Sequence, residues 1–210
     1  MLAGTALVFT LLYALPAGII SALNRNKWVD YLLRAASFVG VSMPTFWLGL
    51  VLIYIFGLKL GLVPIATSRV TPIGVILPAA TLAVVVGSKY MRQVRLVILE
   101  EMEKDYVIGA RARGVSEMKI LFGHILPNAV LPLITILGVV MGWLLGGVAV
   151  VEMVFSWPGL GNMAIYAITM RDYPLIEGFV LWVALAYMCI NALIDASYIL
   201  LDPRLKRERA

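Results

Sequence analysis

Five long stretches of this 210-residue chain contain almost no charged side chain. A helix needs roughly 20 apolar residues to cross a bilayer core of about 30 Å. Four stretches carry no Asp, Glu, Lys or Arg, and the fifth carries only Asp195. They are Met1–Leu23, Ala35–Leu58, Val70–Ser88, Leu121–Val151 and Gly178–Leu201. The sequence therefore predicts an all-α integral membrane protein, a polytopic helical bundle with about five transmembrane helices.

The composition also indicates a chain that lies in lipid. Hydrophobic residues make up 62% and charged residues 14%, whereas soluble domains have about 45–50% and about 25%. A single cysteine excludes a disulfide within the chain, and with a single histidine it leaves no cluster of soft metal ligands. We therefore expect no metal, no cofactor and one transmembrane domain over residues 1–210.

The fourth apolar stretch, Leu121–Val151, is too long for one crossing, because a helix of this length would measure about 46 Å. Pro127 and Pro132 offer points at which the helix can kink or divide. We expect a short helix over Lys119–Leu126 at the cytoplasmic edge, followed by a span over about Leu131–Val151.

The uncharged segment Met153–Met170 is interpreted differently. Its centre, Trp157–Asn162, is rich in residues that break helices and favour turns. The sequence therefore predicts an external loop over residues 152–177 that contains a short interfacial helix.

The basic residues predict the orientation in the membrane. Three segments, Asn24–Arg34, Lys89–Lys119 and Leu201–Ala210, hold 14 of the 17 Lys and Arg residues. By the positive-inside rule these segments are cytoplasmic, so the N-terminus lies outside and the C-terminus inside. The net charge of +5 is then explained by topology and by a docking surface, and no nucleic-acid partner is expected.

Lys89–Lys119 is the longest polar segment of the chain. A short helix over about Asp105–Arg113 would have acidic residues near its start and basic residues near its end, as the helix dipole favours. Gly114 suits the left-handed position that ends a helix, and Ser116 can cap a second one. The segment predicts a helix, a glycine turn and a second helix; the alternative is a solvated basic loop that only fixes the topology.

The residues around this turn resemble a known family. Ala110-Arg-Ala-Arg-Gly114, followed after nine residues by His124-Ile-Leu-Pro127, is similar to the EAA loop of ABC importer permeases. Asp105-Tyr106-Val107 ahead of it resembles the variant found in permeases for peptides and nickel, with Arg113 in place of the usual Lys. Further similar segments are Ser42–Gly49, Asn128–Pro132, Val151–Gly161, Arg171–Pro174, Asn191, Asp195 and Asp202–Arg204.

This resemblance implies a permease subunit that forms half of a solute path and contains no ATPase site. The loop would be a coupling helix that docks on a separate cytoplasmic ATPase. The implied partners are two ATPase subunits, a second homologous permease, an extracytoplasmic substrate-binding protein and membrane lipid. The residues expected to dock are Ala110, Arg111, Ala112, Arg113 and Gly114, with Asp105 and Tyr106 in support. The chain itself lacks the G-x-x-x-x-G-K-[S/T] pattern of a phosphate-binding loop.

Two polar residues of the last stretch, Asn191 and Asp195, lie one helical turn apart. A carboxylate inside a membrane must face protein or water. Asp195 is therefore expected to pair with a basic residue near the cytoplasmic edge or to line the path, and Asn191 to share its network.

Small residues recur every four positions in the fourth stretch, at Gly138, Gly142 and Gly146. Such a row lets another helix pack closely. The helix could belong to this subunit or to a second permease.

Four residues of the external loop have two possible roles: they contact a docked binding protein, or they form an ordinary belt at the membrane interface. The residues concerned are Glu152, Trp157, Pro158 and Gly159.

Substrate and completeness are less constrained. Di- or oligopeptides are the first expectation, and nickel or another small solute is the second. An ATP-independent transporter or channel subunit would predict more intramembrane charges and an internal repeat, and an intramembrane enzyme would need a nucleophile with a base. Permeases of this family usually have six spans, so the chain looks one N-terminal span short; a signal peptide over Met1–Leu23 is the alternative. The expected location is the cell membrane, with several crossings.

Overall fold

The computed structural model describes residues 1–65, 70–146 and 148–201, and these residues form helices and no strand. Arg69 and Asp202–Arg204 lie outside the described residues. In chain order the elements are α1 (Leu2–Leu23), α2 (Trp28–Ser42), α3 (Thr45–Leu52), the π-helix η1 (Ile53–Lys59), α4 (Ile76–Met102), α5 (Asp105–Ala112), α6 (Glu117–Ile120), the π-helix η2 (Leu121–Ile125), α7 (Leu126–Gly146), α8 (Ala149–Val154), α9 (Leu160–Met170) and α10 (Tyr173–Leu201).

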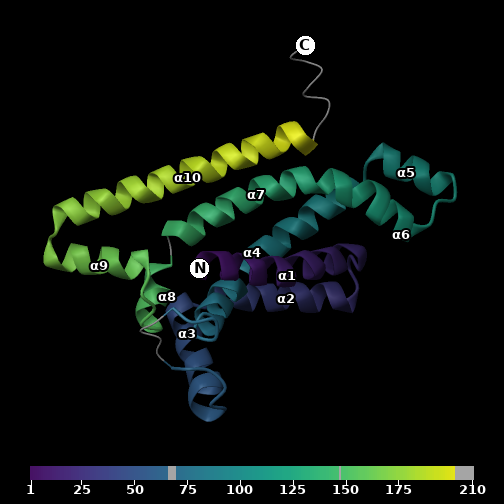
Figure 1. The fold of residues 1–210 in the computed structure, drawn as a ribbon. Coiled ribbons are helices and arrows are strands. Elements are labelled where there is room, and N and C mark those ends of the chain that lie inside the picture. Colours follow the sequence, from purple (N-terminus) through teal and green to yellow (C-terminus); the bar gives the residue numbers. More distant parts are fainter. Residues whose placement is uncertain (66–69, 147, 202–210) are drawn as a thin grey trace.

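The long helices run in similar directions, with α5 and α6 at one end of the molecule and α9 at the other (Figure 1). Three helices are long and apolar enough to cross a membrane: α1, the continuous helix Glu117–Gly146, and α10 over Tyr173–Tyr198. These helices confirm the predicted all-α, polytopic membrane fold. The expected total of five spans requires that α4 and the bent pair of α2 with α3 and η1 be counted as well.

The prediction of one uninterrupted span over Ala35–Leu58 is wrong. The helix ends at Ser42, and α3 leaves at an angle of 102° to α2. Pro44 explains the break, because a proline ring clashes with helical geometry at the residue before it. Met43 accordingly adopts an extended conformation, with ψ at 128°.

The predicted division of the fourth apolar stretch is also wrong. Glu117–Gly146 forms a continuous helix of 30 residues, and Pro132 lies inside it. The π-helical segment η2 ends at Ile125, two residues before Pro127. A π-helical turn re-pairs backbone groups that a proline would leave without partners, so the helix continues. The helix ends at Gly146 and not near Val151, because α8 forms separately.

The central element of the fold is α4, and more than half of its residues are buried. Small residues bring it close to α1. A Cβ at Gly18 would lie 2.6 Å from the Cβ of Val94, and a Cβ at Gly87 would lie 2.8 Å from Cδ1 of Tyr13. This close approach of two backbones is typical of membrane helices that pack through small residues.

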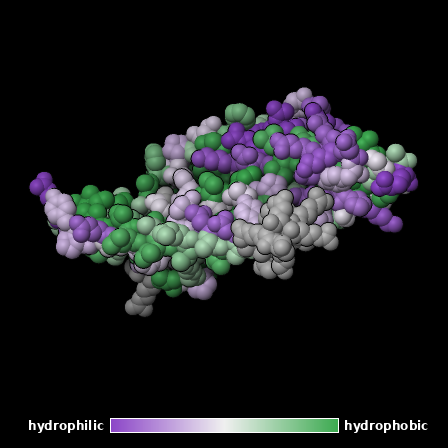
Figure 2. Space-filling view, turned by 90° about the horizontal axis from the view of Figure 1, so that it is seen from above, coloured by the Kyte–Doolittle hydropathy of each residue, from purple (hydrophilic) through white to green (hydrophobic). Residues whose placement is uncertain are grey.

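The polar segment that starts at Lys89 is therefore not a loop throughout, since α4 continues to Met102. Only the residues after Met102 leave this helix. Figure 2 shows hydrophilic side chains gathered towards the end of the molecule that carries α5 and α6, whereas hydrophobic side chains cover most of the other half.

Candidate functional site

The end of α4 is followed by a helix, a turn and a second short helix, as the sequence predicts. α5 begins at Asp105 and ends at Ala112, and α6 begins after Ser116. Gly114 has φ at +74°, the left-handed conformation that the turn requires. Ser116 occupies the N-cap position with an extended backbone, but its side chain makes no capping hydrogen bond.

The inner face of α5 packs into the hydrophobic core of the protein. Val107 is fully buried and Ala110 is 1% exposed, and both lie in one cluster with Ile120 of α6 and Ile98 of α4. Because Ala110 is enclosed by this cluster, it supports α5 from within. The expectation that Ala110 belongs to the docking surface is therefore wrong.

A buried carboxylate connects α5 to the end of α4. The Glu101 side chain is 7% exposed and accepts hydrogen bonds from Tyr106 Oη and from Lys104 Nζ, both at 2.5 Å. Burial and the adjacent Glu101 raise the pKa of Tyr106 to about 12, so the phenol keeps its proton at physiological pH. Tyr106 thus holds the start of α5 on α4.

An ion pair spans the glycine turn. Arg111 Nε lies 2.8 Å from Glu117 Oε1, and Arg111 Nη2 lies 3.1 Å from Glu117 Oε2. This pair is exposed, so water weakens it, and its two parallel bonds join α5 to the first residue of α6.

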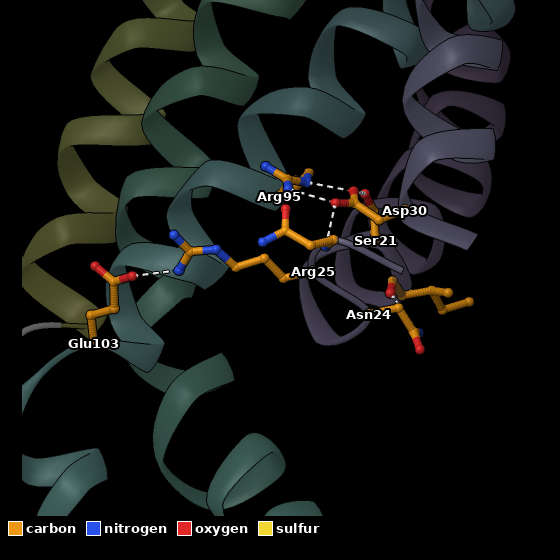
Figure 3. A network of polar contacts seen from close by, with 8 residues as sticks. Ser21, Asn24, Arg25, Asp30, Arg95 and Glu103 are labelled. Atoms are coloured by element: carbon orange, nitrogen blue, oxygen red, sulfur yellow. Dashed lines mark hydrogen bonds and ion pairs between the residues drawn. The ribbon is translucent and has the colours of Figure 1, made fainter. Parts of the chain in front are cut away.

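A second polar network, which the sequence did not reveal, joins three helices nearby (Figure 3). Asp30 of α2 is fully buried and accepts hydrogen bonds from Arg95 Nε and Nη2 of α4, both at 2.8 Å. Ser21 Oγ of α1 donates to Asp30 Oδ1 at 2.6 Å. Arg25 reaches from the α1–α2 turn to Glu103 beside α5, at 2.6 Å. These pairs fix the hairpin of α1 and α2 against α4, next to α5.

At the opposite end, residues 152–177, for which the sequence predicts an external loop with a short helix, comprise the end of α8, a turn, the short helix α9 and the start of α10. Glu152 is 4% exposed and Trp157 is 3% exposed, so neither lies on the outer surface. Glu152 Oε2 accepts the backbone N–H of Asn162 at 2.8 Å, and burial raises the pKa of this carboxyl group. Glu152 thus holds the start of α9. Of the four residues predicted for this loop, Pro158 is exposed and Gly159 is partly exposed.

The last helix makes few of the expected polar contacts. Asp195 of α10 is exposed and forms no ion pair among the described residues, so the expected pairing is absent there; Asn191 is half-buried. The glycine row packs within the chain: a Cβ at Gly138 would collide with Ile194, and one at Gly142 with Tyr187, both on α10. Gly146 has no such neighbour.

Comparison with known proteins identifies the family. A family described as "Binding-protein-dependent transport system inner membrane component" matches residues 14–207. The chain belongs to this family. Its relatives include the glutathione transport system permease protein GsiC of Escherichia coli strain K12, which is 38% identical over 202 residues. GsiC of Shigella boydii serotype 4 is 37% identical over the same length.

These alignments cover 96% of this permease and 66% of each relative, so the chain spans a little under two thirds of their length. The fold resembles that of the MetNI methionine ABC transporter in an inward-facing conformation, with a TM-score of 0.78, 19% identity and coverage of 96% and 91%. The fold also resembles that of an amino acid ABC transporter with histidines, with a TM-score of 0.67 and 18% identity. This match covers 93% of this chain and 86% of that one. The family match and the apolar helices make the chain an inner membrane transport component with several membrane-spanning helices.

The permease also exposes apolar side chains around the turn that sequence analysis missed. Ile108 of α5 is 54% exposed, Met118 of α6 is 64% exposed and Phe122 of η2 is 61% exposed. Their signal in the sequence was weak, because exposed apolar residues in a hydrophobic chain are indistinguishable from residues that face lipid. We call Ile108, Arg111, Ala112, Arg113, Gly114 and Met118 the loop surface.

Proposed function

We propose that this chain is the permease subunit of an ATP-driven importer and forms half of its solute path. The observation that carries the proposal is the α5–turn–α6 unit, which is anchored to the core through its inner face and exposes the loop surface on its outer face. A separate ATPase would dock on this surface. A surface that combines exposed apolar and basic side chains suits a partner groove with apolar walls and acidic groups.

Rigid attachment makes this unit a suitable lever. The hydrogen bond between Tyr106 and Glu101 holds α5 on α4. The negative charge of Asp105, at the first position of α5, interacts favourably with the helix dipole. The Arg111–Glu117 pair closes the turn. A displacement of α5 by the ATPase would therefore move α4 and the continuous helix Glu117–Gly146 together, and would not be absorbed by bending at the turn.

The proposed assembly has two permeases, two ATPases and an extracytoplasmic binding protein. The end with α5 and α6 would face the cytoplasm, as the distribution of basic residues predicts. No residue of Tyr173–Tyr198 in α10 is buried within the chain. A helix so apolar requires lipid or a second permease against it.

The proposed solute is a di- or oligopeptide, or a peptide-like molecule such as glutathione. The names of the relatives that are 37–38% identical support this solute class. Nickel was the second expectation from sequence, and nothing in the described residues favours it.

Replacement of Gly114 tests the proposed coupling. Proline fixes φ near −65°, so Gly114→Pro cannot adopt the observed +74° and should distort the turn. We expect the variant to insert into the membrane but to lose ATP-dependent peptide uptake, measured in vesicles with the assembled importer.

Gly61→Pro is the matched control, because Gly61 also has a positive φ, +60°, and lies far from the turn in sequence. We expect this variant to keep most of the uptake. Unchanged uptake by an inserted Gly114→Pro variant would contradict the coupling role.

A further inference from the structure

Lys89 lies at the midpoint of α4. When α4 is counted as a span, this position is inside the membrane, where charged residues are rare, and not in the cytoplasmic segment that the basic residues predict for it. The contacts between α1 and α4 place Gly87 beside Tyr13, and Gly18 beside Met91. Lys89 is therefore level with the part of α1 between Tyr13 and Gly18. At 1.5 Å per residue, this part lies roughly 8 Å or more inside the end of α1 at Leu23.

The Lys89 side chain is exposed and points along the surface between α4 and α7. Its Nζ lies 5.8 Å from the ring centre of Trp143, a cation–π contact. Side chains on a helix lean towards its N-terminus. The ammonium group therefore lies further from the α5–α6 end than the Lys89 backbone does, and does not extend back towards that end.

A cavity of about 260 Å³ adjoins this ammonium group, between α4 and α7. Apolar side chains form most of its wall, and its polar residues are Lys89, Gln93 and Tyr90. The Tyr90 hydroxyl already donates to the backbone oxygen of Leu133 at 3.1 Å. Lys89, Gln93 and the indole N–H of Trp143 are thus the donors that remain available to a ligand.

The ammonium group also has no carboxylate partner among the described residues. A charge at this depth is not tolerated against lipid tails and must face protein or water. An amide donor, a cation and an aromatic ring around a small cavity complement a carboxylate that is attached to an apolar group.

We propose that Lys89, Gln93 and Trp143 form a binding position for a carboxylate of the transported solute, on a water-accessible wall of the path. This inference rests on the proposed function and adds to it the chemistry of the solute group that is recognised. The volume is sufficient for the carboxyl-terminal residue of a peptide.

The first test measures access of water to Lys89. In a Cys189→Ser background, which removes the only native thiol, Lys89→Cys and Leu181→Cys are treated in vesicles with an anionic, membrane-impermeant thiol reagent during ATP turnover. Leu181 of α10 is 64% exposed and serves as the lipid-facing control. We expect Lys89→Cys to react and Leu181→Cys to remain unmodified. An unreactive Lys89→Cys would overturn the proposal.

The second test separates ligand charge from structure. The assembled importer takes up trialanine, with a free carboxylate, or trialanine amide, without one. A charge-assisted hydrogen bond contributes enough that its loss lowers affinity by about 10-fold or more. We expect Lys89→Met to lower kcat/KM for trialanine by about this factor and to leave the amide unchanged, whereas Lys89→Arg retains uptake of both.

Lys59→Met is the control, because Lys59 also lies over an aromatic ring, that of Tyr54, but on η1 away from the cavity. We expect it to leave both uptakes unchanged. An equal loss for trialanine and its amide in Lys89→Met would show a merely structural role and overturn the inference. If the wild-type importer showed no ATP-dependent uptake of either peptide, the proposed function itself would be contradicted.

Discussion

Two regions of the molecule, α4 with α5 in the middle of the chain and α10 near its C-terminus, are held in opposite ways. α4 and α5 are fixed by a buried cluster and by hydrogen-bonded charges such as Asp30–Arg95 and Glu101–Tyr106. α10 has 29 residues, yet none of those from Tyr173 to Tyr198 is buried, and the helix packs mainly on α7 and α9. The polar segment that contains the end of α4 and α5 is thus firmly anchored, whereas the apolar helix α10 is largely exposed.

This difference follows from the solvent on each side. At the end with α5 and α6, polar side chains can pair with one another and hold a defined geometry. In lipid, apolar side chains gain nothing by packing on each other instead of on lipid tails, so close contact of small residues must hold helices together. Gly138 and Gly142 supply that contact between α7 and α10.

The largest expected effect comes from the anchored region. Arg95→Met would leave Asp30 charged and buried without its main partner, and breaking a buried pair in this way costs about 3–5 kcal/mol. Thermal unfolding of the purified protein in detergent measures the loss.

Arg25→Met is the matched control, because the Arg25–Glu103 pair is more than half exposed. An exposed pair contributes about 0–1 kcal/mol. Equal effects of the two variants would show that the Asp30 network does not anchor α4.

A smaller effect is expected where α10 contacts α7. In Gly142→Ala the new methyl group would collide with the Tyr187 ring, and such overpacking costs about 1–3 kcal/mol. Gly146→Ala meets no neighbour and should leave stability unchanged or raise it by up to about 1 kcal/mol. Protease sensitivity of α10 in detergent reports both changes. If Gly146→Ala loosened α10 as much as Gly142→Ala, the glycine contact would not hold the two helices.

The smallest expected effect concerns pH and the turn between α8 and α9. Burial raises the folded-state pKa of Glu152 above its ordinary value, so its stabilising contribution is present at low pH and is lost as pH rises through the raised pKa. Glu152→Gln stays neutral at every pH. The melting temperature of the wild type, measured relative to this variant, should therefore fall as pH increases from about 4 to 8. A difference that is constant or rises with pH would exclude the burial effect.

Much of the fold could be predicted because the membrane makes local sequence decisive. Uncharged runs predict α1 and most of α10, and Gly114 predicts the turn after α5, since few other residues adopt a positive φ. The break at Met43-Pro44 has a signal in the sequence, the proline itself, but the uncharged run around it predicts a span.

The contacts of the site were harder to predict because they join residues far apart in the chain. Asp30 and Arg95 are separated by 65 positions, and each alone looks like a charge at the membrane edge. Ala110 was expected on the docking surface because small residues allow close approach from either side, and only packing reveals that its side faces the core. The continuous helix through Pro127 and Pro132 depends on η2, which no residue pattern predicts.

The most direct test of the proposed permease–ATPase contact is cross-linking between this chain and its ATPase. In the Cys189→Ser background, Met118→Cys on the loop surface and Leu193→Cys on α10 are compared; Leu193 is 71% exposed. A short thiol-to-amine cross-linker is applied to the assembled importer, and the products are identified by mass spectrometry. We predict that Met118→Cys links to the ATPase and that Leu193→Cys does not. A link from Leu193→Cys with none from Met118→Cys would contradict the account.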